Sequence, residues 1–403
     1  MDGLEGCEAA RRQDPGPRRD QPSDQCGRAS RTDFVAHPEL CERRRAGKCD
    51  RRYRLRLFAR LEHGARPSRS AMGEAFRAGR RGRSGIAGAV ALREPEAPPL
   101  PEGIADYIAA VKIARDGPRP DLETARLIAD ANAHRIAVPR PEGMRVTDSF
   151  VVTPGLETPV RIYRPACEGA QAAIAYFHGG GFTTGSIESY DCLAAALAEA
   201  TGATVVSVHY MRLPEATPRA MIDQCFDTLV WIAAMAEPLA IDASRLCVAG
   251  DSAGAYIAAQ LAILARDRNG PAIAAQLLCY GVFDFDETRP GLAAARDPIL
   301  TLPIVRMMNA TWRECDARDP LPFPPPLETD DLSGLPPALL LGAALDPLLE
   351  QSQAYAERLT AAGVDARFET AEAMPHGFLR AQRFSPAARD AMRSLGDAFR
   401  SLI

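Results

Sequence analysis

The sequence predicts an α/β fold in which a mostly parallel sheet is covered by helices on both faces. Short apolar runs of strand length alternate with helical patterns from about residue 144 to the end of the chain. These runs are apolar throughout, which is typical of parallel strands buried on both faces. The chain has 403 residues, which is enough for one large domain with additional segments.

Residues 1–98 do not contribute to this pattern. They are rich in arginine and poor in aliphatic side chains, as in "CERRRAGKCDRRYRLRLFARL". Such a segment buries too little apolar surface to offset the entropy of ordering it, so we expect a disordered or non-native leader. The leader would be non-native if translation starts further along, for instance at Met72. The alternative is a basic arm that contacts nucleic acid or acidic lipid.

Two amphipathic helices are predicted within 99–143, before the first strand. One face of the first helix carries four apolar residues: Ile104, Tyr107, Ile108 and Val111. Gly117 and Pro118 are placed to end this helix, and Asp121 is placed to cap the second. Neither helix can bury its apolar face alone, so we expect both to lie on the domain that follows.

The α/β domain is predicted to span 144–403, with strands and helices in regular alternation. Strands are predicted over 145–154, 158–166, the first part of 172–182, 203–210, 246–249, 274–281, 337–347 and 365–372. Helices are predicted over 191–202, 221–236, the stretch after Ser252, 348–363, and from Ser385 onward. Most successive strands are separated by a predicted helix, as expected for parallel strands, which are joined by helical crossover connections.

Composition excludes several classes of function. The formal net charge is −4 and the isoelectric point is near 6.0, so we expect no nucleic-acid partner. No apolar run approaches the roughly 18–20 residues that a membrane span needs.

The ten cysteines show no paired spacing, so we expect no metal site. No secretory signal is recognised, and we therefore expect free thiols and a cytoplasmic protein.

The motif GDSAG, 250–254, lies where the apolar run 246–249 gives way to a helical pattern. A serine in a sharp turn from strand to helix is lifted clear of the sheet, and only small flanking residues fit so tight a turn. The amide of Ala253 then points to the same space as the Ser252 hydroxyl. We interpret Ser252 as a nucleophile and Asp251 as a supporting residue. An ordinary glycine turn is the alternative.

A serine nucleophile needs a base, and His376 is the histidine that follows Ser252 in the chain. It lies in the loop "MPHGF", after a predicted strand. The acid is expected between the two, and Asp346 directly follows the apolar part of the stretch 337–347, where Pro347 breaks the strand. Asp346 is also placed to cap the next helix. Asp284 and Asp286 are the rival acids.

The stretch HGGGF, 178–182, stands at the end of another apolar strand. Successive glycines let the backbone approach a substrate oxygen closely, so the amides of this loop are candidates for an oxyanion hole beside that of Ala253. The candidate residues are Gly179, Gly180 and Gly181. His178 is expected to brace the loop. No GK[ST] follows, so a phosphate-binding loop is a poor fit.

Together, "HGGGF", "GDSAG", "LDP" and "MPHGF" resemble the hormone-sensitive-lipase family of α/β-hydrolases, in its microbial esterase branch. The similarity runs from about residue 99 to the end. It implies an eight-stranded sheet with a helical cap, formed here by 99–143 and by an insertion at about 284–330. It also implies hydrolysis of short- to medium-chain carboxylic esters with no cofactor.

Some positions depart from the family pattern. Met211 replaces an arginine, and Tyr256 stands where an asparagine is usual. These departures do not involve the proposed triad, but they affect the shape of the substrate site. The residues expected to line that site are Phe182, Tyr256, Tyr107 and Ile108.

The sequence therefore predicts a serine carboxylesterase that works through an acyl-enzyme on a small-molecule ester, as a monomer or a homodimer. An amidase, formamidase or lactonase could use the same triad. A non-catalytic small-molecule receptor on the same fold is the alternative from another class, although the retained His376 argues against it.

Overall fold

The computed structural model describes residues 99–112, 121–166 and 169–403. In these ranges eight strands form one sheet, in the order β1-β2-β4-β3-β5-β6-β7-β8. The strands are β1 (Arg145–Thr153), β2 (Leu156–Arg164), β3 (Gln171–Phe177), β4 (Thr204–Val208), β5 (Ile241–Asp251), β6 (Gln276–Cys279), β7 (Ala338–Ala343) and β8 (Ala366–Ala371). β2 pairs antiparallel with β1 and β4, and the remaining pairs are parallel. The predicted α/β fold is confirmed.

Burial along the strands explains the apolar runs in the sequence. Every residue of β3, β4, β6 and β7 is buried, because helices cover both faces of the sheet where these strands lie. The edge strands β1 and β8 contain exposed and half-buried residues instead. β5 begins at Ile241, five residues before the apolar run that predicted it, because its first part pairs with Gln171 at the start of β3.

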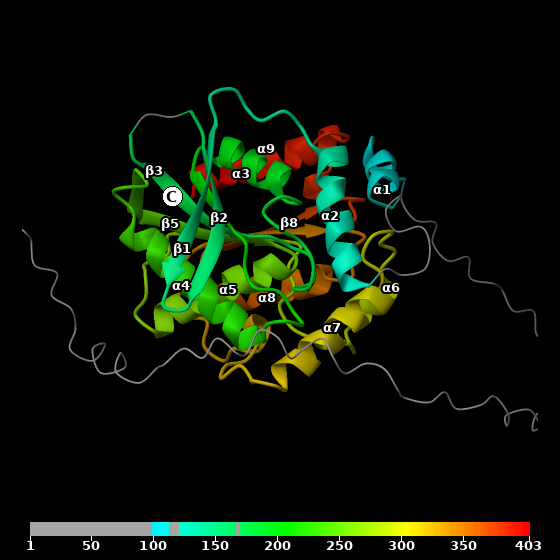
Figure 1. Cartoon of the computed structure of the whole chain (residues 1–403). Helices are drawn as coiled ribbons and strands as arrows, with labels where there is room; N and C mark the ends of the chain where they lie inside the picture. Colours follow the sequence, from blue (N-terminus) through cyan, green and yellow to red (C-terminus); the bar gives the residue numbers. More distant parts are fainter. Residues whose placement is uncertain (1–98, 113–120, 167–168) are drawn as a thin grey trace, which may run out of the picture. The chain divides into compact units, whose positions relative to one another are not determined.

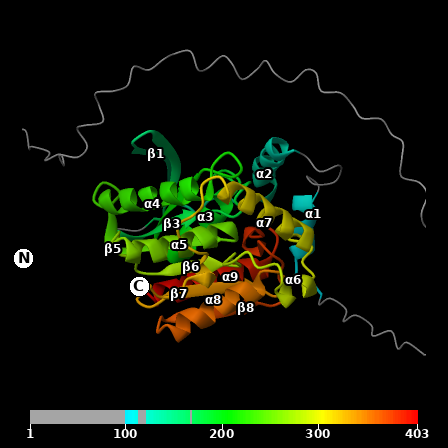
Figure 2. The same ribbon diagram turned by 90° about the horizontal axis from the view of Figure 1, so that it is seen from below.

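Two helical layers enclose the sheet (Figures 1 and 2). They consist of α3 (Asp191–Thr201) and α9 (Pro386–Arg400) on one face, and of α4 (Pro218–Ala234), α5 (Ala253–Asp267) and α8 (Leu349–Ala361) on the other. Leu193 of α3 and Met392 of α9 belong to one buried apolar cluster. Ile222 of α4, Ile257 of α5 and Tyr355 of α8 belong to a second cluster. Each layer therefore has its own apolar core.

Four further helices lie together at one side of the sheet in both views: α1 (Ile104–Lys112), α2 (Leu122–Ile136), α6 (Pro290–Ala294) and α7 (Leu302–Asp316) (Figures 1 and 2). They come from the two stretches expected to form a cap. Asp121 caps α2 as predicted, since its carboxylate accepts a hydrogen bond from the Thr124 amide. Gly117, Pro118 and the leader at 1–98 lie outside the described residues. Of the helices in the described ranges, none has the length and apolar character to cross a membrane.

Candidate active site

The turn between β5 and α5 holds Ser252 in an uncommon backbone conformation, with φ 56° and ψ −121°. A Cβ on Gly250 would lie 2.1 Å from the carbonyl oxygen of Gly254. A Cβ on Gly254 would lie 1.8 Å from the carbonyl oxygen of Phe177, at the end of β3. No side-chain carbon fits at these distances. Both glycines of the motif are therefore required by close backbone packing.

The side chains of Ser252, His376 and Asp346 form a chain of hydrogen bonds. His376 Nε2 lies 2.8 Å from Ser252 Oγ, and its Nδ1 lies 2.6 Å from Asp346 Oδ2. The second carboxylate oxygen of Asp346 accepts a hydrogen bond of 2.9 Å from the Leu348 amide. Asp346 thus contacts the histidine and holds the turn before α8 (Leu349–Ala361) at the same time. The expected helix cap is not formed by Asp346, because the N-cap residue of α8 is Leu348, whose side chain forms no capping hydrogen bond.

The rival acids do not reach the histidine. The carboxylate of Asp284 is buried and pairs with the Arg289 guanidinium. Asp286 accepts hydrogen bonds from the amide and hydroxyl of Thr288. The structure therefore brings Asp346, and neither rival, to His376.

Charges around His376 determine its protonation. Burial lowers the pKa of His376, but the carboxylate of Asp346 raises it, and Asp297 and Asp251 raise it further. The net direction is upward from the ordinary value of 6.5. A raised pKa makes the imidazole a stronger base toward the hydroxyl of Ser252.

The glycine loop after β3 presents amides next to this triad, but one of its glycines departs from the prediction. The Gly179 amide donates a 2.9 Å hydrogen bond to Asp251 Oδ1, so it is not available to a substrate oxygen. Gly180 and Gly181 adopt φ values of 117° and 60°. Among the described residues, their amides and that of Ala253 have no acceptor. The candidate oxyanion hole is therefore Gly180, Gly181 and Ala253, without Gly179.

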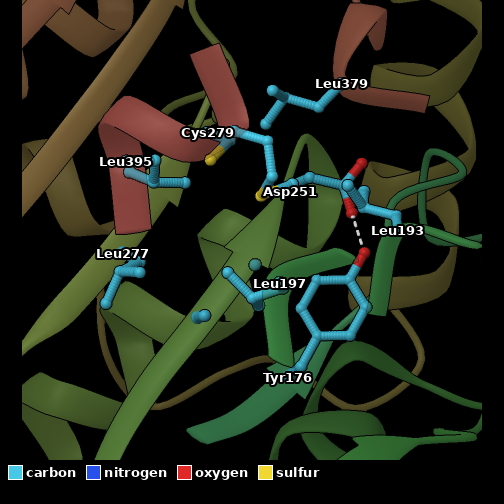
Figure 3. Close-up of a pocket in the computed structure, with 11 residues that line it drawn as sticks. Tyr176, Leu193, Leu197, Asp251, Leu277, Cys279, Leu379 and Leu395 are labelled. Atoms are coloured by element: carbon cyan, nitrogen blue, oxygen red, sulfur yellow. Dashed lines mark hydrogen bonds between the residues drawn. The ribbon is translucent and has the colours of Figure 1, made fainter. Parts of the chain in front are cut away.

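Asp251, at the end of β5, holds the glycine loop through its carboxylate. Its Oδ1 accepts hydrogen bonds from the Gly179 amide and, at 2.6 Å, from the Tyr176 hydroxyl. Figure 3 shows the Tyr176–Asp251 bond at the edge of a small cavity whose other labelled residues are apolar, apart from Cys279. Burial raises the pKa of Asp251, and the hydrogen bonds from Tyr176 and Gly179 oppose that rise. Asp251 thus supports the glycine loop through a hydrogen bond from the Gly179 amide.

His178 is packed between aromatic rings at the start of the same loop. Its imidazole stacks on Tyr210 at 4.4 Å and on Tyr190 at 5.3 Å between ring centroids. Its Nδ1 donates to the Gly179 carbonyl, and burial lowers its pKa to about 3. His178 is therefore neutral at ordinary pH and holds the loop through packing, in agreement with a bracing role.

The four residues expected to line the substrate site fall into two groups. Phe182 and Tyr256 are buried and meet edge to face at 5.5 Å between centroids, and both rings contact Trp312 of α7. Tyr107 and Ile108 pack into the apolar cluster that contains α3 and α9. The Tyr107 hydroxyl donates to the Gly377 carbonyl, next to His376. Tyr107 is thus placed to hold the histidine loop.

Sequence reasoning missed other contacts at this site. The Asp297 carboxylate accepts a hydrogen bond from the His376 amide. The Met308 side chain of α7 lies against Gly181, where an added Cβ would be 2.6 Å from the methionine Cε. Arg126 of α2 donates to the Thr183 carbonyl and forms a two-bond ion pair with Glu215. No motif identifies Asp297, Met308 or Arg126, because each contacts a residue that is distant in the sequence.

Across the described ranges, no His, Cys, Asp and Glu side chains gather as metal ligands would. The site brings together a hydroxyl, an imidazole within hydrogen-bonding distance of it, and backbone amides without an acceptor among the described residues, which is the set of groups that nucleophilic catalysis uses.

The chain is similar in sequence and in structure to known esterases. Residues 174–380 match a family model described as the alpha/beta hydrolase fold. Carboxylesterase NlhH of Mycobacterium tuberculosis is 36% identical over 309 residues, which are 74% of this chain and 94% of that protein. Ethyl acetate hydrolase of Pseudomonas putida is 37% identical over 240 residues, which are 58% of this chain and 74% of that protein. The solved structure of a hyperthermophilic esterase from Pyrobaculum calidifontis aligns with a TM-score of 0.68 at 29% identity, covering 75% of this chain and 99% of that one.

Proposed function

Because the chain belongs to the hormone-sensitive-lipase-like branch of the α/β-hydrolases and is a carboxylic ester hydrolase, we propose that it cleaves esters through an acyl-enzyme on Ser252. His376 Nε2 takes the hydroxyl proton as Ser252 Oγ attacks the ester carbonyl carbon. Asp346 accepts the Nδ1 proton in a hydrogen bond, which keeps the imidazole in the right tautomer and stabilises its charged form.

The amides of Gly180, Gly181 and Ala253 bind the oxyanion that forms on the substrate carbonyl. The C–O bond of the ester then breaks, and the alcohol leaves with the proton from His376. Water attacks the acyl-enzyme by the reverse route, with His376 as its base, and releases the carboxylic acid. This sequence needs no cofactor, and each proton that His376 takes is returned.

The observation that carries this proposal is the continuous hydrogen bonding from Ser252 through His376 to Asp346. Beside it, the amides of Gly180, Gly181 and Ala253 have no acceptor among the described residues. An ordinary glycine turn would require none of these contacts. A receptor would not need a base within 2.8 Å of the serine hydroxyl.

The acyl group is proposed to be short. Met308 covers Gly181, and the rings of Phe182, Tyr256 and Trp312 fill the space next to the glycine loop. The relative from Pseudomonas putida is named an ethyl acetate hydrolase, which is in line with a small ester. The cytoplasmic location and the monomeric or homodimeric state stay predictions.

A fluorophosphonate probe tests the proposal directly. We expect the full-length chain to be labelled, and peptide mapping to place the adduct on Ser252. A panel of p-nitrophenyl esters, matched anilides and lactones then separates an esterase from an amidase or a lactonase. Absence of labelling, or an adduct on another serine, would contradict the proposed mechanism.

A further inference from the structure

Asp297 is a buried carboxylate that lies outside the proposed triad but contacts it. It belongs to the segment between α6 and α7, within the insertion after β6, and is only 7% exposed. Its Oδ2 accepts a hydrogen bond of 2.5 Å from the backbone amide of His376. These residues are 79 positions apart in the chain, so this contact depends on how the insertion packs on the sheet.

The other oxygen of Asp297 holds its own segment in place. Oδ1 accepts hydrogen bonds from the amides of Ile299, at 2.7 Å, and Leu300, at 2.8 Å. Three backbone amides therefore converge on one carboxylate. Burial raises the pKa of Asp297, and the charge of His376 and the hydrogen bonds from the His376 and Leu300 amides oppose that rise. One side chain thus fixes the turn before α7 and, through its second oxygen, the backbone of the histidine.

The loop that carries His376 is held from two sides. Asp297 binds the His376 amide, and the Tyr107 hydroxyl of α1 donates to the carbonyl of Gly377 at 3.2 Å. Both helical segments expected to form a cap thus contact consecutive residues of this loop. Of the two contacts, only that of Asp297 also brings a negative charge.

We propose that Asp297 is a positioning residue for His376: it fixes the histidine backbone to the insertion and places a second carboxylate beside the imidazole. This inference rests on the proposed function in that His376 is taken as the base of the reaction. It implies that the packing of the insertion on the sheet determines both the orientation of the imidazole and how strongly it binds a proton.

Several groups besides Asp297 face the imidazole. Asp346 approaches from the loop after β7, Asp251 from the end of β5, and the Tyr280 ring packs edge to face at 5.1 Å from after β6. The Arg380 guanidinium in turn lowers the pKa of Asp251. Removing one carboxylate should therefore lower the pKa of His376 without abolishing its elevation.

The test is a titration of the histidine Cε1–H signals by NMR in the full-length chain, with His376 assigned from the spectrum of His376→Ala. We expect Asp297→Asn to lower the pKa of His376 by about half a unit to one unit, because a neighbouring negative charge is lost. We expect kcat on p-nitrophenyl acetate to fall about tenfold, because the amide of the new side chain would face the His376 amide as a second donor.

Two controls separate charge from geometry. Asp284→Asn removes another buried carboxylate of the insertion, which pairs with Arg289, and should leave the pKa of His376 unchanged. Tyr107→Phe removes the bond to Gly377 and no charge, so it should lower kcat without moving that pKa. An Asp297→Asn protein with the wild-type pKa of His376 would overturn the inference and leave Asp297 as a structural residue.

A further variant keeps the test decisive if Asp297→Asn does not fold. Asp297→Glu retains the charge but changes its reach, so we expect the pKa of His376 within about 0.3 units of wild type, with kcat reduced several-fold. A lowered pKa, or an unchanged kcat, in Asp297→Glu would overturn the inference. The NMR titration needs no turnover, so failure of the esterase proposal would be recognised separately, by the lack of probe labelling at Ser252.

Discussion

His376 Nε2 lies 2.8 Å from Ser252 Oγ, although the two residues are 124 positions apart in the chain. Ser252 follows β5 and His376 follows β8, with β6 and β7 between these strands in the sheet. Because β5 to β8 are parallel, the segments that leave their carboxyl ends gather at one edge of the sheet. The contact is therefore a consequence of strand order.

Replacing the serine tests the nucleophile. We expect Ser252→Ala to lower kcat on p-nitrophenyl acetate by roughly 10⁵–10⁶, because the acyl-enzyme can no longer form. Ser207→Ala is the matched control: Ser207 is buried in β4, and its hydroxyl has no partner among the described residues. Wild-type turnover in Ser252→Ala would rule out its role.

Replacing the acid tests the tautomer of the histidine. In Asp346→Asn, the side-chain oxygen can still accept from the Leu348 amide, so the turn is retained. The new NH₂ group would then face His376 Nδ1 and favour the tautomer with its proton on Nε2, which cannot accept the serine proton. We expect kcat to fall roughly 10⁴-fold with little change in melting temperature. An equal loss in Asp284→Asn would contradict this assignment.

The pH dependence of kcat/KM should report the ionisation of His376. The base must be neutral to take the serine proton, and its pKa is raised above 6.5. Activity should therefore be full at alkaline pH and should fall with unit slope as pH drops through a value above about 6.5. His178, whose pKa is lowered to about 3, adds no ionisation in that range. A profile that stays flat down to pH 4 would exclude His376 as the base.

The three residues of the proposed triad could be picked out from the sequence because each follows a predicted strand. The two glycines around Ser252 were predictable as well, since a turn this tight leaves no space for a Cβ. The α/β fold followed from the uniformly apolar strands and the helical patterns between them.

Other features depend on packing that periodicity does not encode. The Gly179 amide was expected to face the substrate, but it binds Asp251, a contact that joins the ends of β3 and β5. Asp297 carried no signal, because an acidic residue in a loop is usually exposed, and only the packing of the insertion buries it against His376. The helix α7 was expected only from the family resemblance.

Met308 is expected to limit the length of the acyl chain. Its side chain lies against Gly181, so Met308→Ala should open space beside the proposed oxyanion hole. We expect the ratio of kcat/KM for p-nitrophenyl octanoate to that for the acetate to rise roughly tenfold, since each newly buried methylene contributes about 0.8 kcal/mol. Met307→Ala is the matched control on the same helix, because Met307 is 36% exposed. Equal ratios in the two variants would show that Met308 does not set this limit.

Gly254 should be the glycine of the serine turn that least tolerates a side chain. A Cβ there would lie 1.8 Å from the Phe177 carbonyl oxygen and 2.8 Å from that of His178. Both oxygens belong to backbone at the end of β3, which the sheet and the glycine loop hold in place. Gly254→Ala must therefore push α5 away from β3, and we expect it to lower the melting temperature by more than about 10 °C or to prevent folding.

Gly202→Ala separates this clash from ordinary backbone strain. Gly202 ends α3 with φ 69°, and nothing lies within 4 Å of an added Cβ, so only the cost of a left-handed residue remains. That cost is about 1 kcal/mol, which corresponds to a few degrees in melting temperature for a domain of this size. The two variants are compared by calorimetry of the full-length chain. If Gly254→Ala melts no lower than Gly202→Ala, close contact between α5 and β3 is not what requires the second glycine of the motif.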